Sequence, residues 1–335
     1  MRKTPTPLAP LIAAGATALM MATGPALGAG LDDVVTGHIL PGHAAFAERT
    51  AALADTAAAE CTGPATQEAY HAAFDAWMGI SHIQFGPIED LNLSLSIAYW
   101  PDPKNRTGKA LARLVADEDP IAQDRTAYSE VSIAAQGLFA LERLLYDPAF
   151  SSGPYVCALT ATVAGALADT AGELADAWPD YAELLTNPGP DNPVYPTEAD
   201  AARKVYTALY TGLEFDRDTR LGRPLGTYDR PRPNRAEARL SERSQRNVEL
   251  SLAALNQLAD LLATDPAPRT SAAFAAARRR VSELDDPVFA GVADPMSRFR
   301  IEALQQEVRD IQTEMATEIG TALGVTAGFN AMDGD

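Results

Sequence analysis

Apolar residues recur with helical spacing along almost the whole chain, and no useful length alternates apolar and polar residues as a strand does. Alanine, the best helix former, is abundant throughout. Hydrophobic residues make up 47% of the 335, too many for a disordered acidic chain. The pattern predicts an all-α fold, with helices at residues 32–60, 64–81, 104–117, 123–146, 155–177, 197–221, 235–263, 270–283 and 296–323.

Prolines and glycines predict how these helices are grouped. Residues 187–196 hold four prolines and a glycine, so they form the best candidate linker. We therefore expect two helical bundles, one over residues 29–186 and one over residues 197–335. Residues 85–103 lack helical period and are predicted to be a long non-helical crossing, a kind of loop that often carries function.

The N-terminus has the layout of a secretory signal peptide. Two basic residues precede an uncharged apolar run over residues 8–23, and Ala26 and Gly28 fit the −3 and −1 positions of a cleavage site. The run is broken by proline and glycine and is shorter than the roughly 18 residues of a membrane span. We therefore expect a signal peptide at residues 1–28 and a soluble periplasmic protein, with no later stretch apolar enough to cross a bilayer.

The charge of the chain limits its partners. Asp and Glu number 45 against 27 Lys and Arg, a formal net charge of −18, which becomes −20 without the two basic residues of the signal peptide. That field repels nucleic acid and anionic membrane surfaces and attracts cations. The expected partner is therefore a metal ion or small ligand.

Only two cysteines are present, Cys61 and Cys157. An even pair in an oxidising compartment favours one disulfide that closes a long loop. Two buried free thiols are the alternative, because the sequence does not show that the two Cα atoms approach each other.

Common catalytic signatures are absent from the sequence, including His-Glu-x-x-His, Gly-x-Ser-x-Gly, Cys-x-x-Cys and a phosphate-binding glycine loop. With four His and two Cys, a closed zinc site built from protein side chains alone is not expected. Any site would be made mainly of carboxylates, helped by His, Tyr or Arg.

One carboxylate falls on an apolar helical stripe. Val131, Ala135, Leu138, Glu142 and Leu145 follow helical spacing, so Glu142 is expected among apolar neighbours. A carboxylate buried there needs a proton, a cation or a hydrogen-bond donor. It is either a site residue or a structural residue paired with an Arg of another helix, and spacing alone does not decide.

A second stripe holds His71, Asp75, Met78 and His82, side chains that could offer nitrogen and oxygen to a metal. For His71 and Asp75 a solvated helix face is the favoured interpretation. His82 differs because it stands at the helix end, directly before the irregular segment, where loops place binding residues.

Residues 99–106 contain further candidates. Trp100 lies in a predicted loop and needs a surface to pack against, for example in a cleft between the bundles. Asp102 has the structural alternative of capping the helix that starts near Lys104.

A locally basic stretch follows in the second half of the chain. It could clamp a carboxylate-rich ligand, but internal ion pairs to the acidic excess are the favoured interpretation. Its members are Arg217, Arg220, Arg223, Arg230, Arg232, Arg235, Arg239, Arg243 and Arg246.

Four stretches, in their order and spacing, resemble the imelysin family, bacterial envelope proteins tied to iron uptake and once classed with metallopeptidases. They are Leu40-Pro41, Phe85-Gly86-Pro87 running on to Tyr99-Trp100-Pro101-Asp102, Gly137 to Glu142, and Leu221-Gly222-Arg223-Pro224 with the later Glu237 to Ser244. The resemblance implies two pseudo-symmetric helical bundles with a site at their interface.

The resemblance also implies a function, with one departure. Where the family carries Gly-x-His-x-x-Glu, this chain keeps Gly137 and Glu142 but has Phe139 at the His position. Phenylalanine offers no lone pair to a metal and cannot act as a base. The leading hypothesis is therefore a non-enzymatic periplasmic protein of iron acquisition that binds a metal, a metal complex or an envelope partner. The alternative is a divergent metallopeptidase-like hydrolase.

The predicted site combines these candidates. Glu142 is expected to face the cleft between the bundles and, with His82, to bind a divalent metal or iron. The ligand-binding residues are predicted to be Glu142, Trp100, Asp102, Arg106 and Arg223.

Overall fold

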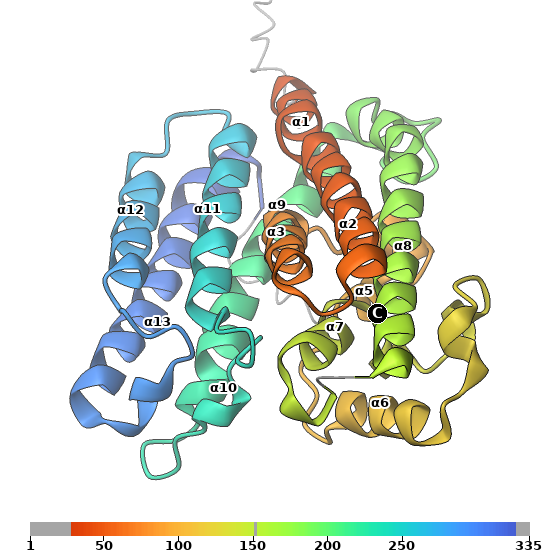
Figure 1. Cartoon of the computed structure of the whole chain (residues 1–335). Coiled ribbons are helices and arrows are strands. Elements are labelled where there is room, and N and C mark those ends of the chain that lie inside the picture. Colours follow the sequence, from red (N-terminus) through yellow and green to blue (C-terminus); the bar gives the residue numbers. More distant parts are fainter. Residues whose placement is uncertain (1–27, 151–152, 326–335) are drawn as a thin grey trace, which may run out of the picture.

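The computed structural model describes residues 28–150 and 153–325 (Figure 1). This part of the chain is helical, contains no strand, and has a single isolated β-bridge between Thr227 and Arg230, which confirms the all-α prediction. Its α-helices are α1 (Gly28–Val34), α2 (Leu40–Glu60), α3 (Pro64–Ile80), α4 (Pro87–Asp90), α5 (Ser94–Ile97), α6 (Arg106–Asp117), α7 (Gly137–Tyr146), α8 (Pro154–Thr186), α9 (Glu198–Glu214), α10 (Gly222–Leu225), α11 (Ser244–Leu262), α12 (Pro268–Ser282) and α13 (Pro295–Met315).

The helices pack in two groups (Figure 1). Helices α2, α3, α7 and α8 pack on one another, and α9, α11, α12 and α13 form the second group. Helix α3 of the first group lies against α11 of the second, and one continuous hydrophobic core runs through both. The stretch between α8 and α9 coincides with the predicted linker at residues 187–196.

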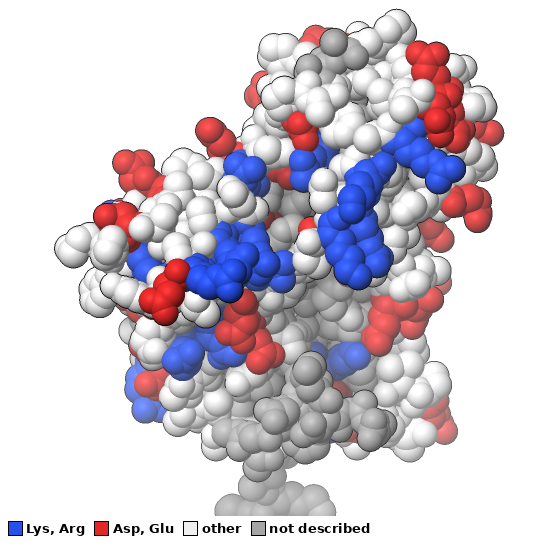
Figure 2. All heavy atoms as spheres, turned by 90° about the horizontal axis from the view of Figure 1, so that it is seen from below, with Lys and Arg blue, Asp and Glu red and all other residues white. Residues whose placement is uncertain are grey.

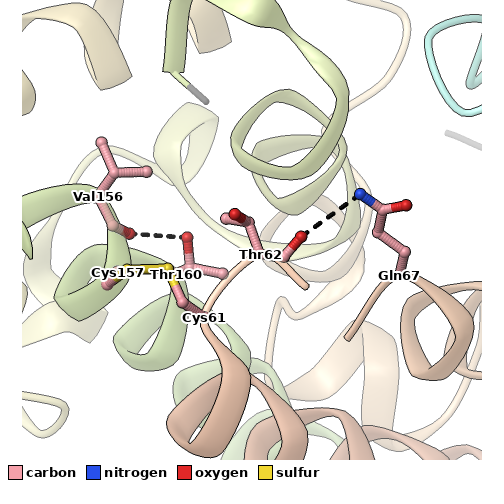
Figure 3. Close-up of a disulfide and its surroundings, with 6 residues drawn as sticks. All are labelled: Cys61, Thr62, Gln67, Val156, Cys157 and Thr160. Carbon is pink, nitrogen blue, oxygen red and sulfur yellow. Dashed lines mark hydrogen bonds between the residues drawn. A yellow bond between two sulfur atoms is a disulfide. The ribbon is translucent and has the colours of Figure 1, made fainter. Parts of the chain in front are cut away.

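A disulfide joins Cys61, directly after α2, to Cys157 in the first turn of α8 (Figure 3). Their Cα atoms are 4.8 Å apart and their sequence positions differ by 96. The predicted bond is thus confirmed, and it fixes the two helices that pack most extensively within the first group.

Helix α8 corrects two expectations. The pattern predicted its end at residue 177, but it continues past Pro179 to Thr186. It is also long and apolar enough, by length and composition alone, to cross a membrane, although no stretch after the signal peptide was expected to be. Its apolar residues Leu159, Val163 and Leu174 are fully buried, as in the core helix of a folded domain. The predicted signal peptide lies, apart from Gly28, outside the described residues.

The first predicted helix, over residues 32–60, is continuous through Pro41, although a proline inside a helix usually kinks or breaks it. A π-helical turn over residues 35–39 widens the helix directly before α2. Pro41 then falls in the first turn of α2, where a missing N–H removes no intrahelical bond.

The predicted helix over residues 123–146 is wrong in its first half. Residues 120–135 form short 3₁₀ turns, and α7 begins only at Gly137. Gly137 has φ +70°, and a Cβ there would lie 2.2 Å from the carbonyl oxygen of Ile97. This glycine therefore ends the turns and lets α7 approach the crossing at residues 85–103, which contains the two short helices α4 and α5.

The predicted helix over residues 235–263 is wrong at its start. Residues 236–243 form a turn in which Ala238 and Glu242 have φ values of 45° and 57°, and α11 begins at Ser244. This turn matters for the site, because it aims backbone N–H groups at the first helix group.

Candidate functional site

A cavity of about 290 Å³ lies between the two helix groups. Residues of α7 and α10 line it, and both helices lie in the lower half of Figure 1. Trp100, Asp102, Phe139, Glu142 and Arg143 line it from the first half of the chain. From the second half the lining includes Arg223, Arg235, Arg239 and Leu240. We name this cavity the arginine pocket.

Glu142 is buried in the wall of the arginine pocket, with 5% of its surface exposed. Its Oε1 accepts hydrogen bonds from the backbone N–H of Ser241, at 3.0 Å, and from the Ser241 hydroxyl, at 2.9 Å. Burial raises the pKa of Glu142, although the Ser241 hydrogen bonds and the charge of Arg143 oppose the rise. The partner is thus a backbone turn and not the Arg that a structural carboxylate was expected to have.

Trp100 and Phe139 form the wall behind the pocket. Their rings stack with centroids 6.2 Å apart, and the Arg223 guanidinium lies 5.8 Å from the Trp100 ring. Phe139, at the position of the motif His, therefore packs an aromatic wall.

Positive charge accumulates in the arginine pocket. Arg223, Arg235 and Arg239 form no ion pair within the described residues, whereas Arg143 is paired with Asp147 at 2.7 Å. The pKa of Arg223 is lowered by burial and by the like charge of Arg235. Figure 2 shows this end of the molecule, where Lys and Arg atoms gather around a hollow. An anion bound there would relieve the repulsion.

Asp102 lines the pocket, but its carboxylate is committed to a helix end. It accepts hydrogen bonds from the backbone N–H groups of Arg106, at 2.8 Å, and Thr107, at 2.9 Å, at the start of α6. These bonds lower its pKa, outweighing the opposite effect of burial. The Arg106 side chain is exposed, donates to the Tyr99 hydroxyl and does not line the pocket.

His82 lines a different cavity, of about 390 Å³, on the other side of Trp100 and Phe139. We name it the aromatic cavity, since Trp77, Trp100, Phe139 and Phe215 line it. The His82 Nε2 lies 3.0 Å from Nε2 of His38, and burial lowers the pKa of His82 well below its ordinary value.

The structure therefore does not bring His82 into the pocket of Glu142. Across the two described ranges, no group of three or more His, Cys, Asp or Glu side chains is arranged to hold a metal ion. Single protein donors such as Glu142 could complete the coordination of a metal that arrives with its own ligands.

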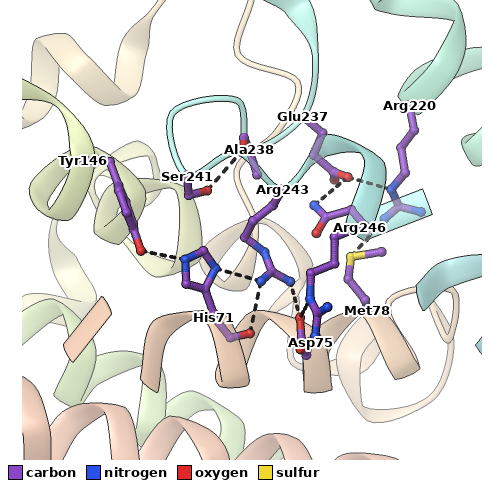
Figure 4. Close-up of polar contacts among 11 residues, drawn as sticks. His71, Asp75, Met78, Tyr146, Arg220, Glu237, Ala238, Ser241, Arg243 and Arg246 are labelled. Atoms are coloured by element: carbon purple, nitrogen blue, oxygen red, sulfur yellow. Dashed lines mark hydrogen bonds and ion pairs between the residues drawn. The ribbon is translucent and has the colours of Figure 1, made fainter. Parts of the chain in front are cut away.

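The helix face with His71 and Asp75 is half-buried in an interface and is not a freely solvated face, which corrects the favoured interpretation (Figure 4). It meets the start of α11: the Arg243 side chain, 1% exposed, pairs with Asp75 and lies 2.9 Å from His71 Nδ1. Arginine only donates, so Nδ1 accepts, and Nε2–H donates to the Tyr146 hydroxyl at 2.9 Å. Arg246 also pairs with Asp75.

The basic stretch divides between the two interpretations that the sequence allowed. Arg217, Arg220, Arg243 and Arg246 form internal ion pairs, as favoured. Arg223, Arg235 and Arg239 instead line the arginine pocket without ion pairs, as the alternative of a ligand-binding cluster requires. Of these three, the sequence singled out only Arg223 as ligand-binding, while Arg235 and Arg239 kept the favoured ion-pair interpretation. Ser241, in the last family motif, was missed.

Fold and site together define an all-α protein with a positively charged cavity between two helix groups. The model of the family described as Imelysin, a peptidase M75 family, matches residues 39–315, and the chain belongs to this family. No curated protein matches it.

Two solved structures have the same fold. An imelysin-like protein from Psychrobacter arcticum 273-4 is 19% identical, with a TM-score of 0.75 over 90% of this chain and 97% of that one. A protein from Parabacteroides distasonis ATCC 8503, named as an iron-regulated protein A precursor, is 12% identical, with a TM-score of 0.74 over 90% of this chain and 95% of that one.

Proposed function

We propose that this chain is an exported, non-enzymatic protein of iron acquisition that binds an anionic metal complex in the arginine pocket. The observation that carries the proposal is the concentration of Arg223, Arg235 and Arg239, without ion pairs, in one cavity of an acidic protein. Fixed guanidinium groups suit carboxylate ligands, which they bind with paired hydrogen bonds.

The donor set favours a complex over a bare metal ion. A bare cation would meet three arginines without ion pairs and one carboxylate that does not cap a helix, that of Glu142, whose Oε1 already accepts from Ser241. A chelate with carboxylate groups carries its own metal ligands and an anionic exterior. In this arrangement the arginines bind the exterior and Glu142 offers an oxygen to the metal. Trp100 covers one side of the complex.

The iron connection and the export rest on relatives. The name of the Parabacteroides distasonis protein contains both iron regulation and a precursor form, which is consistent with the signal-peptide pattern of this chain. Raised protein level on iron starvation would support the assignment to iron acquisition, and an unchanged level would contradict it.

Calorimetric titration of the mature protein tests the binding. Ferric citrate, citrate without iron, and Zn²⁺ alone are the three probes, at low and at physiological salt. We expect saturable binding of ferric citrate that weakens with salt and no stoichiometric binding of Zn²⁺. Stoichiometric Zn²⁺ binding together with turnover of a peptide substrate would favour the hydrolase and overturn the proposal.

Substitutions locate the site. Arg223→Ala and Arg239→Ala should each weaken ferric citrate binding about tenfold or more, since a charged hydrogen bond contributes about 1.5–3 kcal/mol. Arg278→Ala is the matched control, because Arg278 is exposed on α12 and forms no ion pair within the described residues. Equal affinities for all three variants would place the ligand elsewhere.

A further inference from the structure

The aromatic cavity has the size and lining of a small-molecule site. Its volume of about 390 Å³ lies within the range of about 300–1,000 Å³ that is usual for such sites. Trp77, Trp100 and Phe215 give it aromatic walls, and Leu95, which also lines it, is 48% exposed. The cavity thus combines an apolar interior with an apolar residue at the surface.

Glu237 brings a carboxylate to this cavity. Its side chain is 6% exposed, and its Oε2 accepts hydrogen bonds from Arg220, at 2.8 Å, and Asn247, at 3.0 Å. Its Oε1 has no hydrogen-bond partner among the described residues, and Glu237 lines the cavity. Oε1 of Glu237 is therefore available to accept a hydrogen bond from a ligand in the cavity.

The buried charges around Glu237 do not balance. Arg220 is the one cation of the group, and it pairs with two carboxylates, those of Asp216, at 2.6 Å, and Glu237. His82, which also lines the cavity, is neutral because burial keeps its pKa low. The group therefore has a formal charge of −1 in a place with little solvent, where a further cation is favoured.

We propose that the aromatic cavity binds a monovalent organic cation, namely a protonated primary amine joined to an aromatic group. The ammonium donates a hydrogen bond to Oε1 of Glu237, and its positive charge neutralises the formal charge of −1 on the group of Arg220, Asp216 and Glu237. The aromatic part of the ligand packs among Trp77, Trp100 and Phe215. The Phe215 ring already has the Arg220 guanidinium 4.8 Å from its centroid, so the cation lies toward Glu237. This site is a different cavity from the arginine pocket, which has the opposite charge, although Trp100 and Phe139 form a wall of both.

Titration of the mature protein with three ligands of one shape tests the proposal. Benzylamine is protonated at pH 7, benzyl alcohol is neutral and benzoate is an anion, and binding is followed by tryptophan fluorescence and calorimetry. We expect benzylamine to bind at least tenfold tighter than benzyl alcohol, as a hydrogen bond to a charged group implies. Equal affinities for the amine and the alcohol, or no binding of the amine, would overturn it.

Two variants place the ligand. Glu237→Gln removes the charge at nearly constant shape and should abolish the preference for amine over alcohol. Thr211→Leu, at a half-buried position of α9 that lines the cavity, should fill it and weaken both ligands at least tenfold. Arg278→Ala, outside both cavities, is the control. An amine preference that survives in Glu237→Gln would contradict the assignment, and the three-ligand comparison on the natural protein decides even if that variant does not fold.

Discussion

Replacement of Glu142 distinguishes a carboxylate kept for binding from one kept for stability. Glu142→Gln keeps a side-chain oxygen for the two Ser241 donors and removes a buried charge whose pKa burial has raised. A binding residue that carries unfavourable charge should therefore give a variant with equal or higher melting temperature and weaker binding of the metal complex. We expect both effects together.

The magnitude follows from the comparison with Glu142→Ala. That variant leaves the Ser241 N–H without its acceptor, while the Ser241 hydroxyl keeps the Ala238 carbonyl at 3.2 Å. One buried donor without a partner costs about 1–3 kcal/mol. At about 2.1 cal/mol/K of unfolding entropy per residue, a fold of about 300 residues loses about 1.6 °C per kcal/mol, so the alanine variant should melt about 2–5 °C lower.

The assay is thermal unfolding of both variants, followed by circular dichroism, with calorimetric titration of ferric citrate beside it. Glu173→Gln is the control, since Glu173 is exposed on α8 and has no ion pair in the described part of the chain. If Glu142→Gln melts as low as Glu142→Ala and binds ferric citrate normally, the carboxylate is structural and the reasoning fails.

Three further predictions concern the disulfide, the buried histidines and export. Cys61→Ser with Cys157→Ser should destabilise the fold by about 4–5 kcal/mol, the chain-entropy value for a loop of about 100 residues, measured by urea unfolding; an unchanged midpoint would contradict it. Burial lowers the pKa of His43 from 6.5 to about 4. Between these pH values the unfolded chain binds more protons than the folded one, so the free energy of unfolding should fall as the pH decreases, by up to about 3 kcal/mol. The dependence of unfolding free energy on pH should be weaker in His43→Gln. The same pH dependence in both proteins would refute His43 as its cause. Mass spectrometry of periplasmic protein should find Ala29 as the first residue, and an intact Met1 on membrane-bound protein would refute cleavage after Gly28.

Helical spacing predicted the fold class and most helices because the buried stripes of α3, α9 and α13 follow it closely. It failed at residues 123–136 and 235–243, where apolar residues are buried in turns and not on a helix. Glu142 is buried as expected, yet Val131 and Ala135 do not share its helix. Helical spacing of apolar residues therefore predicts which residues are buried better than it predicts whether they are buried in a helix or in a turn.

The candidate site was harder to predict because it depends on contacts across the sequence. The turn that supplies Ser241 lies 99 positions from Glu142, and no local pattern relates the two. His71 and Asp75 likewise bind Arg243 and Arg246 of the other helix group. The polar face of α3 is therefore an interface between the two groups, although its sequence suggests contact with solvent. Local spacing carries no information on such pairs.

In the proposed function, the metal complex lies between the pocket arginines and Glu142. Diffraction from crystals grown with ferric citrate, measured at the iron absorption edge, tests this claim most directly. We expect one anomalous peak in the arginine pocket, next to the Glu142 carboxylate and within reach of Arg223 and Arg239. An iron peak beside His38 and His82 instead, or no ordered iron at saturating ferric citrate, would contradict it.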